Sequence, residues 1–132
     1  MARPNSKTEK KIDKNVCLAL TKACEHFLES INGFQWVTHQ ATYSDFPGSL
    51  FITCVFDSHE NQKKAGDNDD NIRMSKIIQS ELLKIGVKLK APRLQIIYDS
   101  EERCNSEHDG NWAQRLASRE KRSVTHTRAN SN

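Results

Sequence analysis

The sequence predicts an α+β domain: a three-stranded antiparallel or mixed sheet with two helices packed on one face, in the order α-β-β-α-β plus a short C-terminal helix. Two long segments repeat apolar residues every three or four positions, which is typical of amphipathic helices. Three short segments are rich in β-branched and aromatic residues, which is typical of strands. A chain of 132 residues fits one domain, and helices must cover at least one face of so small a sheet.

The first helix is predicted over residues 9–32. Its apolar stripe consists of Ile12, Val16, Leu20, Ala23, Phe27 and Ile31. Gly33 follows the last apolar turn and is a natural C-cap. Residues 1–8 are polar, and we expect them to form a disordered lead-in.

The two strands that follow are predicted to form an antiparallel hairpin. Residues 34–43 are rich in aromatic and β-branched side chains, and residues 50–56 form an almost continuous apolar run. Pro47 and Gly48 lie between them and predict a turn over residues 44–48. The apolar run indicates a strand that is covered on at least one face.

A long polar segment separates the hairpin from the second helix. Residues 57–71 contain few apolar side chains and are predicted to be a mobile linker. The acidic cluster at residues 67–70 supplies N-cap candidates for a helix over residues 72–85, which ends at Gly86. Leu94, Ile96 and Tyr98 then alternate along the chain and predict the third strand.

The composition changes after Tyr98. Residues 99–109 are predicted to form an acidic loop, and a short amphipathic helix is predicted at about residues 111–116. Residues 118–132 are basic and polar, and we expect a disordered tail, so the folded domain spans residues 9–117. The sheet face opposite the two long helices could be exposed, covered by the C-terminal helix or used for a partner.

Charge is unevenly distributed along the chain, which has a net charge of +3. Residues 1–14 carry five basic and two acidic side chains, residues 115–132 carry five and one, and the stretch between them is net acidic. A polyanion would therefore be attracted mainly to the ends. The alternative is that the basic tails only keep the protein soluble.

Neither a membrane span nor an export signal is predicted. No apolar run approaches the roughly 20 residues of a transmembrane helix, and the N-terminus lacks the apolar stretch of a signal peptide. We therefore expect a cytoplasmic protein whose four cysteines, Cys17, Cys24, Cys54 and Cys104, are reduced thiols. The oligomeric state is left open.

Basic side chains gather at two places that could contact phosphates. The candidate nucleic-acid contacts are Lys84, Lys88, Lys90, Arg93, Arg119, Lys121 and Arg122. The first four surround the start of the third strand, and the last three lie in the C-terminal tail. Phe34, Trp36 and Tyr43 could stack bases if the sheet face is open, although such aromatic residues are more often core.

Cys104 and His108 lie four residues apart in the acidic segment and could contribute to a zinc site. A structural site needs four ligands, and no second paired motif is present. Nearby carboxylates raise a thiol's pKa, which argues against a reactive thiolate. We therefore expect no catalytic residue, no bound metal and no cofactor. A metal-dependent enzyme built on residues 99–109 is the third alternative for function.

The stretch from Lys84 to Asp99, together with the apolar hairpin, resembles ribosome-binding factor A. The resemblance covers about half the chain and includes Pro92, Leu94 and Tyr98 after a basic run. It implies a fold of the K-homology class of RNA-binding domains. The chain departs from that pattern because it lacks a glycine-x-x-glycine clamp and a clear small-residue break in the second helix.

Several short phrases are similar to those of a small uncharacterised gammaproteobacterial family whose members are often labelled Fis-like transcriptional regulators. They are Gly33-Phe34-Gln35-Trp36, Cys54-Val55-Phe56-Asp57, Asp99-Ser100-Glu101-Glu102 and Gly110-Asn111-Trp112. The resemblance implies a bacterial cytoplasmic protein. True Fis ends in a helix-turn-helix, whereas this chain is predicted to end in one short helix and a polar tail.

These observations favour a small bacterial binding or regulatory protein over an enzyme. We expect it to contact RNA or the ribosome more readily than specific DNA sites. The rival hypothesis is a protein–protein adaptor that uses the sheet face or Trp112 and binds no nucleic acid. No membrane partner is expected.

Overall fold

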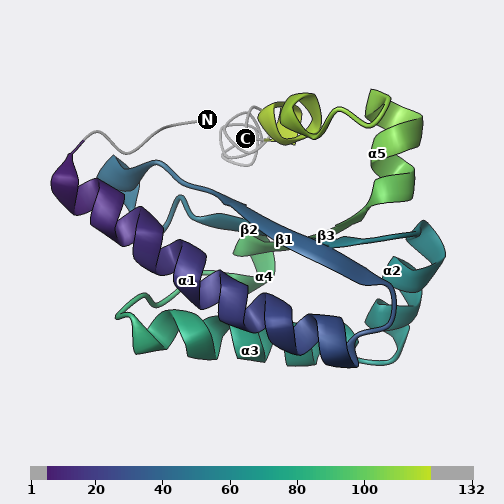
Figure 1. Cartoon of the computed structure of the whole chain (residues 1–132), viewed down its shortest axis with the longest axis horizontal. Helices are drawn as coiled ribbons and strands as arrows, with labels where there is room; N and C mark the ends of the chain where they lie inside the picture. The colour runs from purple at the N-terminus through teal and green to yellow at the C-terminus, as the bar shows by residue number, and fades with distance from the viewer. Residues whose placement is uncertain (1–5, 120–132) are drawn as a thin grey trace, which may run out of the picture.

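The computed structural model of the protein describes residues 6–119, and the predictions made for residues 1–5 and 120–132 lie outside it. The sheet has the strand order β1-β2-β3. β1 (Phe34–Gln40) is antiparallel to β2 (Phe51–Phe56), and β3 (Ile96–Ser100) is parallel to β2 (Figure 1). The predicted α+β class with a mixed three-stranded sheet is confirmed.

α1 (Lys7–Ser30) begins two residues earlier than predicted because Ser6 caps it. The backbone N–H of Glu9 donates to Ser6 Oγ at 3.0 Å, and this bond satisfies one of the free donors of the first turn. Lys7 and Thr8 are therefore helical and do not belong to a disordered lead-in. Gly33 has φ +83°, a left-handed conformation that favours glycine, and it turns the chain into β1.

The connection between β1 and β2 is longer than the predicted turn. β1 ends at Gln40, and a short 3₁₀ helix, η1 (Tyr43–Asp45), follows it. Thr42 and Ser49 close this loop: the Thr42 N–H donates to Ser49 Oγ at 3.0 Å, and the Ser49 hydroxyl donates to the Thr42 carbonyl at 2.7 Å. Tyr43 was expected in the strand and instead lies in this loop.

The predicted linker over residues 57–71 is wrong, because most of it forms a helix, α2 (His59–Asp67). Ser58 caps this helix by accepting a hydrogen bond from the Asn61 N–H at 3.1 Å. Ala65 is the buried residue of α2, so the helix has no apolar stripe that periodicity could detect. Asp69, at φ 67°, separates α2 from α3 (Asp70–Lys84).

The third strand begins later than predicted. α3 buries Met74, Ile78 and Leu82 and ends before Gly86. Pro92 then starts a single helical turn, α4 (Pro92–Gln95), because proline suits the first position of a helix. Leu94 was expected in the strand and is instead 73% exposed on this turn. The crossover through α2 and α3 brings the chain back to the start of the sheet, so β3 runs parallel to β2.

The predicted acidic loop over residues 99–109 is also wrong. Asp99 and Ser100 end β3, and Glu101 begins a helix, α5 (Glu101–His108). Ser100 caps α5 by accepting from the Arg103 N–H at 3.1 Å. Residues 112–119 form a further helix, which is the predicted C-terminal helix extended toward the tail.

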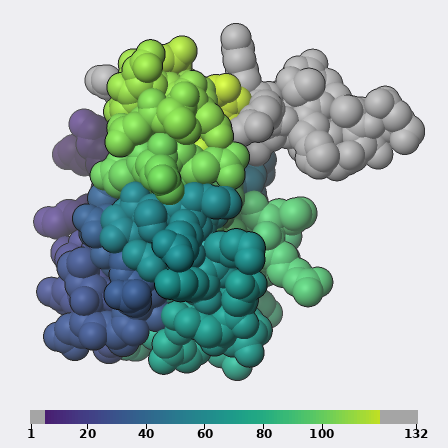
Figure 2. Space-filling model, turned by 90° about the vertical axis from the view of Figure 1, so that its right-hand side faces the viewer, coloured from purple at the N-terminus to yellow at the C-terminus, as the bar shows by residue number. Residues whose placement is uncertain are grey.

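Helices lie on both sides of the sheet (Figure 1). α1 and α3 pack on one face, as predicted, against Ile52, Cys54 and Phe56 of β2. α5 and the helix of residues 112–119 lie on the other side, and in Figure 2 they form a green and yellow layer stacked over α2. Within residues 6–119, no helix is both long and apolar enough to cross a lipid bilayer.

Candidate functional site

A shallow groove runs along α3 beside the β3 edge of the sheet. It consists of two adjoining hollows of about 450 and 440 Å³, both open to solvent, which share Lys76 and Gln79. The first hollow lies between α3 and the segment of α4 and β3, and it includes Arg93 and Tyr98. The second continues along α3 to Lys84. We call these two hollows the α3 groove.

The α3 groove combines cations with exposed apolar side chains. Lys76, Lys84 and Arg93 line it, and no carboxylate of the described residues does. Ile72 and Leu83 line the two hollows and are 53% and 56% exposed. Such a surface can pair with phosphates and also contact the apolar faces of sugars or bases.

Two polar side chains tie the elements beside the groove to the rest of the fold. Tyr98 donates its hydroxyl to the Asn71 carbonyl at 3.0 Å, which ties β3 to the start of α3. Gln95 is buried and donates its amide to the carbonyls of Pro47 at 2.8 Å and Leu50 at 2.9 Å. Gln95 also accepts from the Ala91 N–H at 2.7 Å, and these bonds hold α4, and with it Arg93, against the hairpin loop.

Asn71 lines the first hollow. Its side-chain oxygen Oδ1 is buried and has no hydrogen-bond partner among the described residues. A buried carbonyl oxygen without a donor is unfavourable.

The structure brings together part of the predicted basic set. Arg93 and Lys84 line the α3 groove. Lys84 also forms an ion pair of 3.1 Å with the buried carboxylate of Glu81. Lys88 and Lys90 are exposed on the connection between α3 and α4, but neither lines the groove. The side chain of Lys90 lies near Gly48 instead. Lys121 and Arg122 lie outside the described residues.

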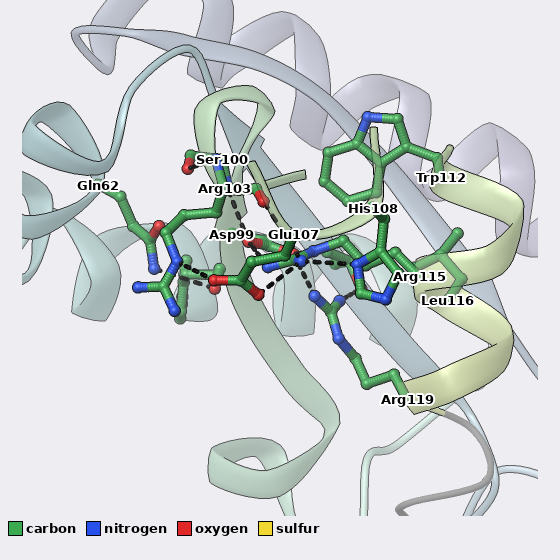
Figure 3. A network of polar contacts seen from close by, with 12 residues as sticks. Gln62, Asp99, Ser100, Arg103, Glu107, His108, Trp112, Arg115, Leu116 and Arg119 are labelled. Carbon is green, nitrogen blue, oxygen red and sulfur yellow. Dashed lines mark hydrogen bonds and ion pairs between the residues drawn. The ribbon is translucent and has the colours of Figure 1, made fainter. Parts of the chain in front are cut away.

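Arg119 is held in a buried network on the sheet face opposite α1 and α3 (Figure 3). Asp99, at the end of β3, accepts from Arg115 Nε at 2.7 Å and from Arg115 Nη2 at 3.0 Å, a bidentate pair. Arg119 also donates to Asp99, and to Thr53 Oγ1 of β2 at 3.1 Å. Burial alone would raise the pKa of Asp99, but the two guanidinium groups hold this pKa below its usual value. The carboxylate is therefore ionised, and Arg119 is already paired.

A second clamp on the same face involves both tryptophans. Glu101 accepts from the Trp36 indole N–H at 3.0 Å and from the Trp112 indole N–H at 2.5 Å. The two rings meet edge to face with centroids 4.8 Å apart. Phe34 is buried in the core. Because Trp36 packs against Trp112 and Phe34 lies in the core, neither ring offers an open surface on which a base could stack.

The acidic segment forms no open set of metal ligands. Cys104 is fully buried, and burial raises the pKa of its thiol. His108 Nδ1 lies 3.0 Å from Arg115 Nη1. The nearby carboxylates of Glu102 and Glu107 accept from the His59 N–H and from two arginines respectively. These bonds engage both carboxylates in contacts within the fold.

Sequence reasoning identified Arg93 and Lys84 but missed the apolar part of the groove. Ile72 and Leu83 belong to a helix whose apolar residues looked like a broad buried stripe, and an accessible residue cannot be distinguished from a buried one by periodicity. Comparisons with protein-family models, with curated proteins and with solved structures found no match.

Proposed function

We propose that the protein binds single-stranded nucleic acid, RNA in preference to specific DNA sites, along the α3 groove. The observation that carries the proposal is the groove's charge. Lys76, Lys84 and Arg93 line it and none of the described residues that line it is acidic, although Lys84 is paired with Glu81 at 3.1 Å, whereas the stretch between the basic ends of the chain is net acidic. A local cationic channel of this kind attracts a phosphate backbone.

The shape of the groove supports an extended strand over a duplex. α3 is packed into the core through Met74 and Ile78, and β3 and α4 flank its accessible side. A helix held in this way is not free to enter a DNA major groove as a recognition helix does. An extended strand can instead lie along the helix, with phosphates near Lys76 and Arg93 and bases near Ile72 and Leu83.

The resemblance to ribosome-binding factor A supports RNA as the nucleic acid. The junction between the consecutive helices α2 and α3 has the sequence Gly-Asp-Asn-Asp-Asp over residues 66–70. This junction is acidic and has no glycine-x-x-glycine clamp, so the α3 groove supplies the phosphate contacts in this proposal. The four free cysteines suit a reducing compartment, and we place this function in the cytoplasm.

Binding of fluorescently labelled single strands tests the proposal. The full chain is titrated into a mixed-sequence RNA, the DNA of the same sequence and the corresponding duplex, between 50 and 200 mM salt. We expect the RNA to bind tightest, and its affinity to fall with a log–log salt slope that reflects about two to three phosphate contacts.

Charge reversal locates the contact. Lys76→Glu and Arg93→Glu are each expected to weaken binding about tenfold and to lower the salt slope by about 1. Lys22→Glu on α1 is the matched control, because Lys22 is exposed and does not line the groove. Absence of binding, a flat salt response, or equal loss in the control would contradict the proposal.

A protein adaptor is the second candidate, and exposed leucines favour it. Leu83 and Leu94 are 56% and 73% exposed on or beside the groove, which suits an apolar partner surface. The salt titration separates the two functions, since an apolar interface does not weaken steeply with salt. Leu94→Ala would then weaken partner binding while leaving any nucleic-acid affinity within about twofold.

A further inference from the structure

Three side chains with different metal-binding groups meet between α1 and β1. Asp13 and Cys17 lie one turn apart on α1, and His39 comes from the β1 face that packs against this helix. A carboxylate oxygen, the thiol sulfur and an imidazole nitrogen all lie within 4.8 Å of one another. This cluster is at the β1 edge of the sheet, whereas the α3 groove lies at the β3 edge.

The distances suit a single ion. Zinc binds thiolate at about 2.3 Å and imidazole or carboxylate at about 2.0–2.2 Å, so its ligand atoms lie about 3.5 Å apart. His39 Nε2 is already 3.0 Å from Asp13 Oδ1. Cys17 is exposed, so its thiol can turn toward the other two ligands without disturbing the core.

A second group orients the carboxylate. The Tyr43 hydroxyl donates to Asp13 Oδ1, and the Tyr43 ring stacks on Phe46 with centroids 5.3 Å apart. Hydrogen bonds of this kind commonly hold metal-binding carboxylates in position. The hydrogen bond leaves Asp13 Oδ2 as a second oxygen of the same carboxylate. η1, which is unexpected from the sequence, therefore delivers the supporting residue.

The charges also favour a divalent ion. A thiolate and a carboxylate together balance a 2+ charge, and neutral imidazole completes a mixed sulfur, nitrogen and oxygen set that suits zinc better than magnesium or calcium. The arrangement does not suit a cysteine nucleophile, because His39 Nε2 contacts Asp13 at 3.0 Å.

We propose that Asp13, Cys17 and His39 form a binding site for a zinc-class divalent ion, with a fourth position open to water on the exposed side. Three protein ligands and one open position are the pattern of accessible zinc sites. The ion links α1 to β1 and closes the edge of the sheet. The site does not depend on the nucleic-acid proposal.

Titration of the full, metal-free chain with Co²⁺ alone tests the site. Cobalt reports tetrahedral coordination by visible absorption and reports thiolate ligation by a near-ultraviolet charge-transfer band. We expect both bands to saturate at one equivalent and to disappear when Zn²⁺ displaces the cobalt. Absence of the charge-transfer band would overturn the proposal.

Variants identify the ligands. Cys17→Ser is expected to abolish the charge-transfer band, and Asp13→Asn and His39→Gln to weaken binding at least about tenfold, as is Tyr43→Phe through its support of Asp13. Cys24→Ser, two turns along the same helix, is the matched control and should keep the band. A band that survives in Cys17→Ser, or is lost in Cys24→Ser, contradicts the assignment.

Alkylation of Cys17 in the wild-type chain tests the site without relying on variants that fold. In the wild-type chain, Zn²⁺ should slow alkylation of Cys17 by iodoacetamide at least about tenfold, because a metal-bound thiolate is not free to react. Peptide mass spectrometry distinguishes Cys17 from Cys24 in the same sample. Equal rates for Cys17 with and without Zn²⁺ would overturn the proposal even if the variants fail to fold.

Discussion

The two faces of the sheet are stabilised by different kinds of contact. Under α1 and α3 the strands present apolar side chains such as Ile52, Cys54 and Phe56, all fully buried. On the opposite face they present Thr53 and Asp99, which bind the arginines of the C-terminal helix. We call these the apolar face and the polar face. The comparison shows one small sheet using non-directional burial on one side and specific pairing on the other.

The two kinds of contact have different consequences. Apolar burial stabilises by about 25 cal/mol per Å² and tolerates many side-chain arrangements. A buried ion pair loses hydration energy and recovers it only in one geometry. The apolar face therefore provides most of the stability, while the polar face determines where the C-terminal helix sits.

The largest expected effect is a truncation on the apolar face. Phe27 is fully buried and meets Phe34 edge to face, with ring centroids 5.3 Å apart. Phe27→Ala should reduce the free energy of unfolding by about 3–5 kcal/mol, because it removes apolar burial and leaves a cavity. Urea unfolding followed by far-ultraviolet circular dichroism measures the loss. A change below 1 kcal/mol would mean that α1 contributes little to the core.

A smaller effect is expected from breaking the polar face. Asp99→Asn removes the carboxylate that both Arg115 and Arg119 bind, leaves Arg115 paired with Glu107, and should cost about 2–3 kcal/mol. The loss should concentrate in residues 112–119, so trypsin should cleave after Arg115 much faster than in the wild type. Asp67→Asn is the matched control, since its pair with Lys63 is exposed and should change stability by less than about 0.5 kcal/mol.

Acid should reduce the difference in stability between the wild type and Asp99→Asn. The pKa of Asp99 is lowered in the folded protein despite burial, because of Arg115 and Arg119, so its contribution is present above the unfolded value of about 3.9 and is lost as the pH falls through the folded pKa. The stability gap between wild type and Asp99→Asn should therefore be full at pH 6 and shrink below about pH 4. A gap that stays constant to pH 2 would show that the charge of Asp99 is not what matters.

The smallest effect tests the tryptophan clamp. Trp112→Phe keeps an aromatic ring beside Trp36 but removes the N–H that donates to Glu101. We expect a loss of about 1 kcal/mol, the usual value of one hydrogen bond. Urea unfolding followed by the fluorescence of the remaining Trp36 measures it. A loss larger than that of Asp99→Asn would mean that the indole clamp, and not the ion pair, positions the C-terminal helix.

Two helices, α2 and α5, were not predicted from the sequence, for the same physical reason. α2 and α5 bury one residue each, Ala65 and Cys104, so neither shows an apolar stripe. Their serine caps, Ser58 and Ser100, are visible in the sequence, but serine is also common in loops. These helices form because the rest of the fold holds their ends, through contacts such as the Glu102 carboxylate with the His59 N–H.

The candidate sites were only partly predictable. Basic residues near the start of the third strand were visible, and Arg93 and Lys84 do line the groove. Arg119 looked equivalent in the sequence, yet it pairs with Asp99, which lies twenty residues earlier in the chain. The meeting of His39 with Asp13 was not predictable, because the register of α1 on β1 sets which side chains face each other.

The sequence by itself determined the fold class, the two long amphipathic helices and the hairpin, because periodicity and turn residues act locally along the chain. The tertiary structure alone decided which charges are buried, which apolar residues stay accessible and which metal-binding groups meet. Those outcomes depend on the parallel return of β3 and on the docking of residues 112–119. Both are set by contacts between residues far apart in the chain, and local patterns carry no information about such contacts.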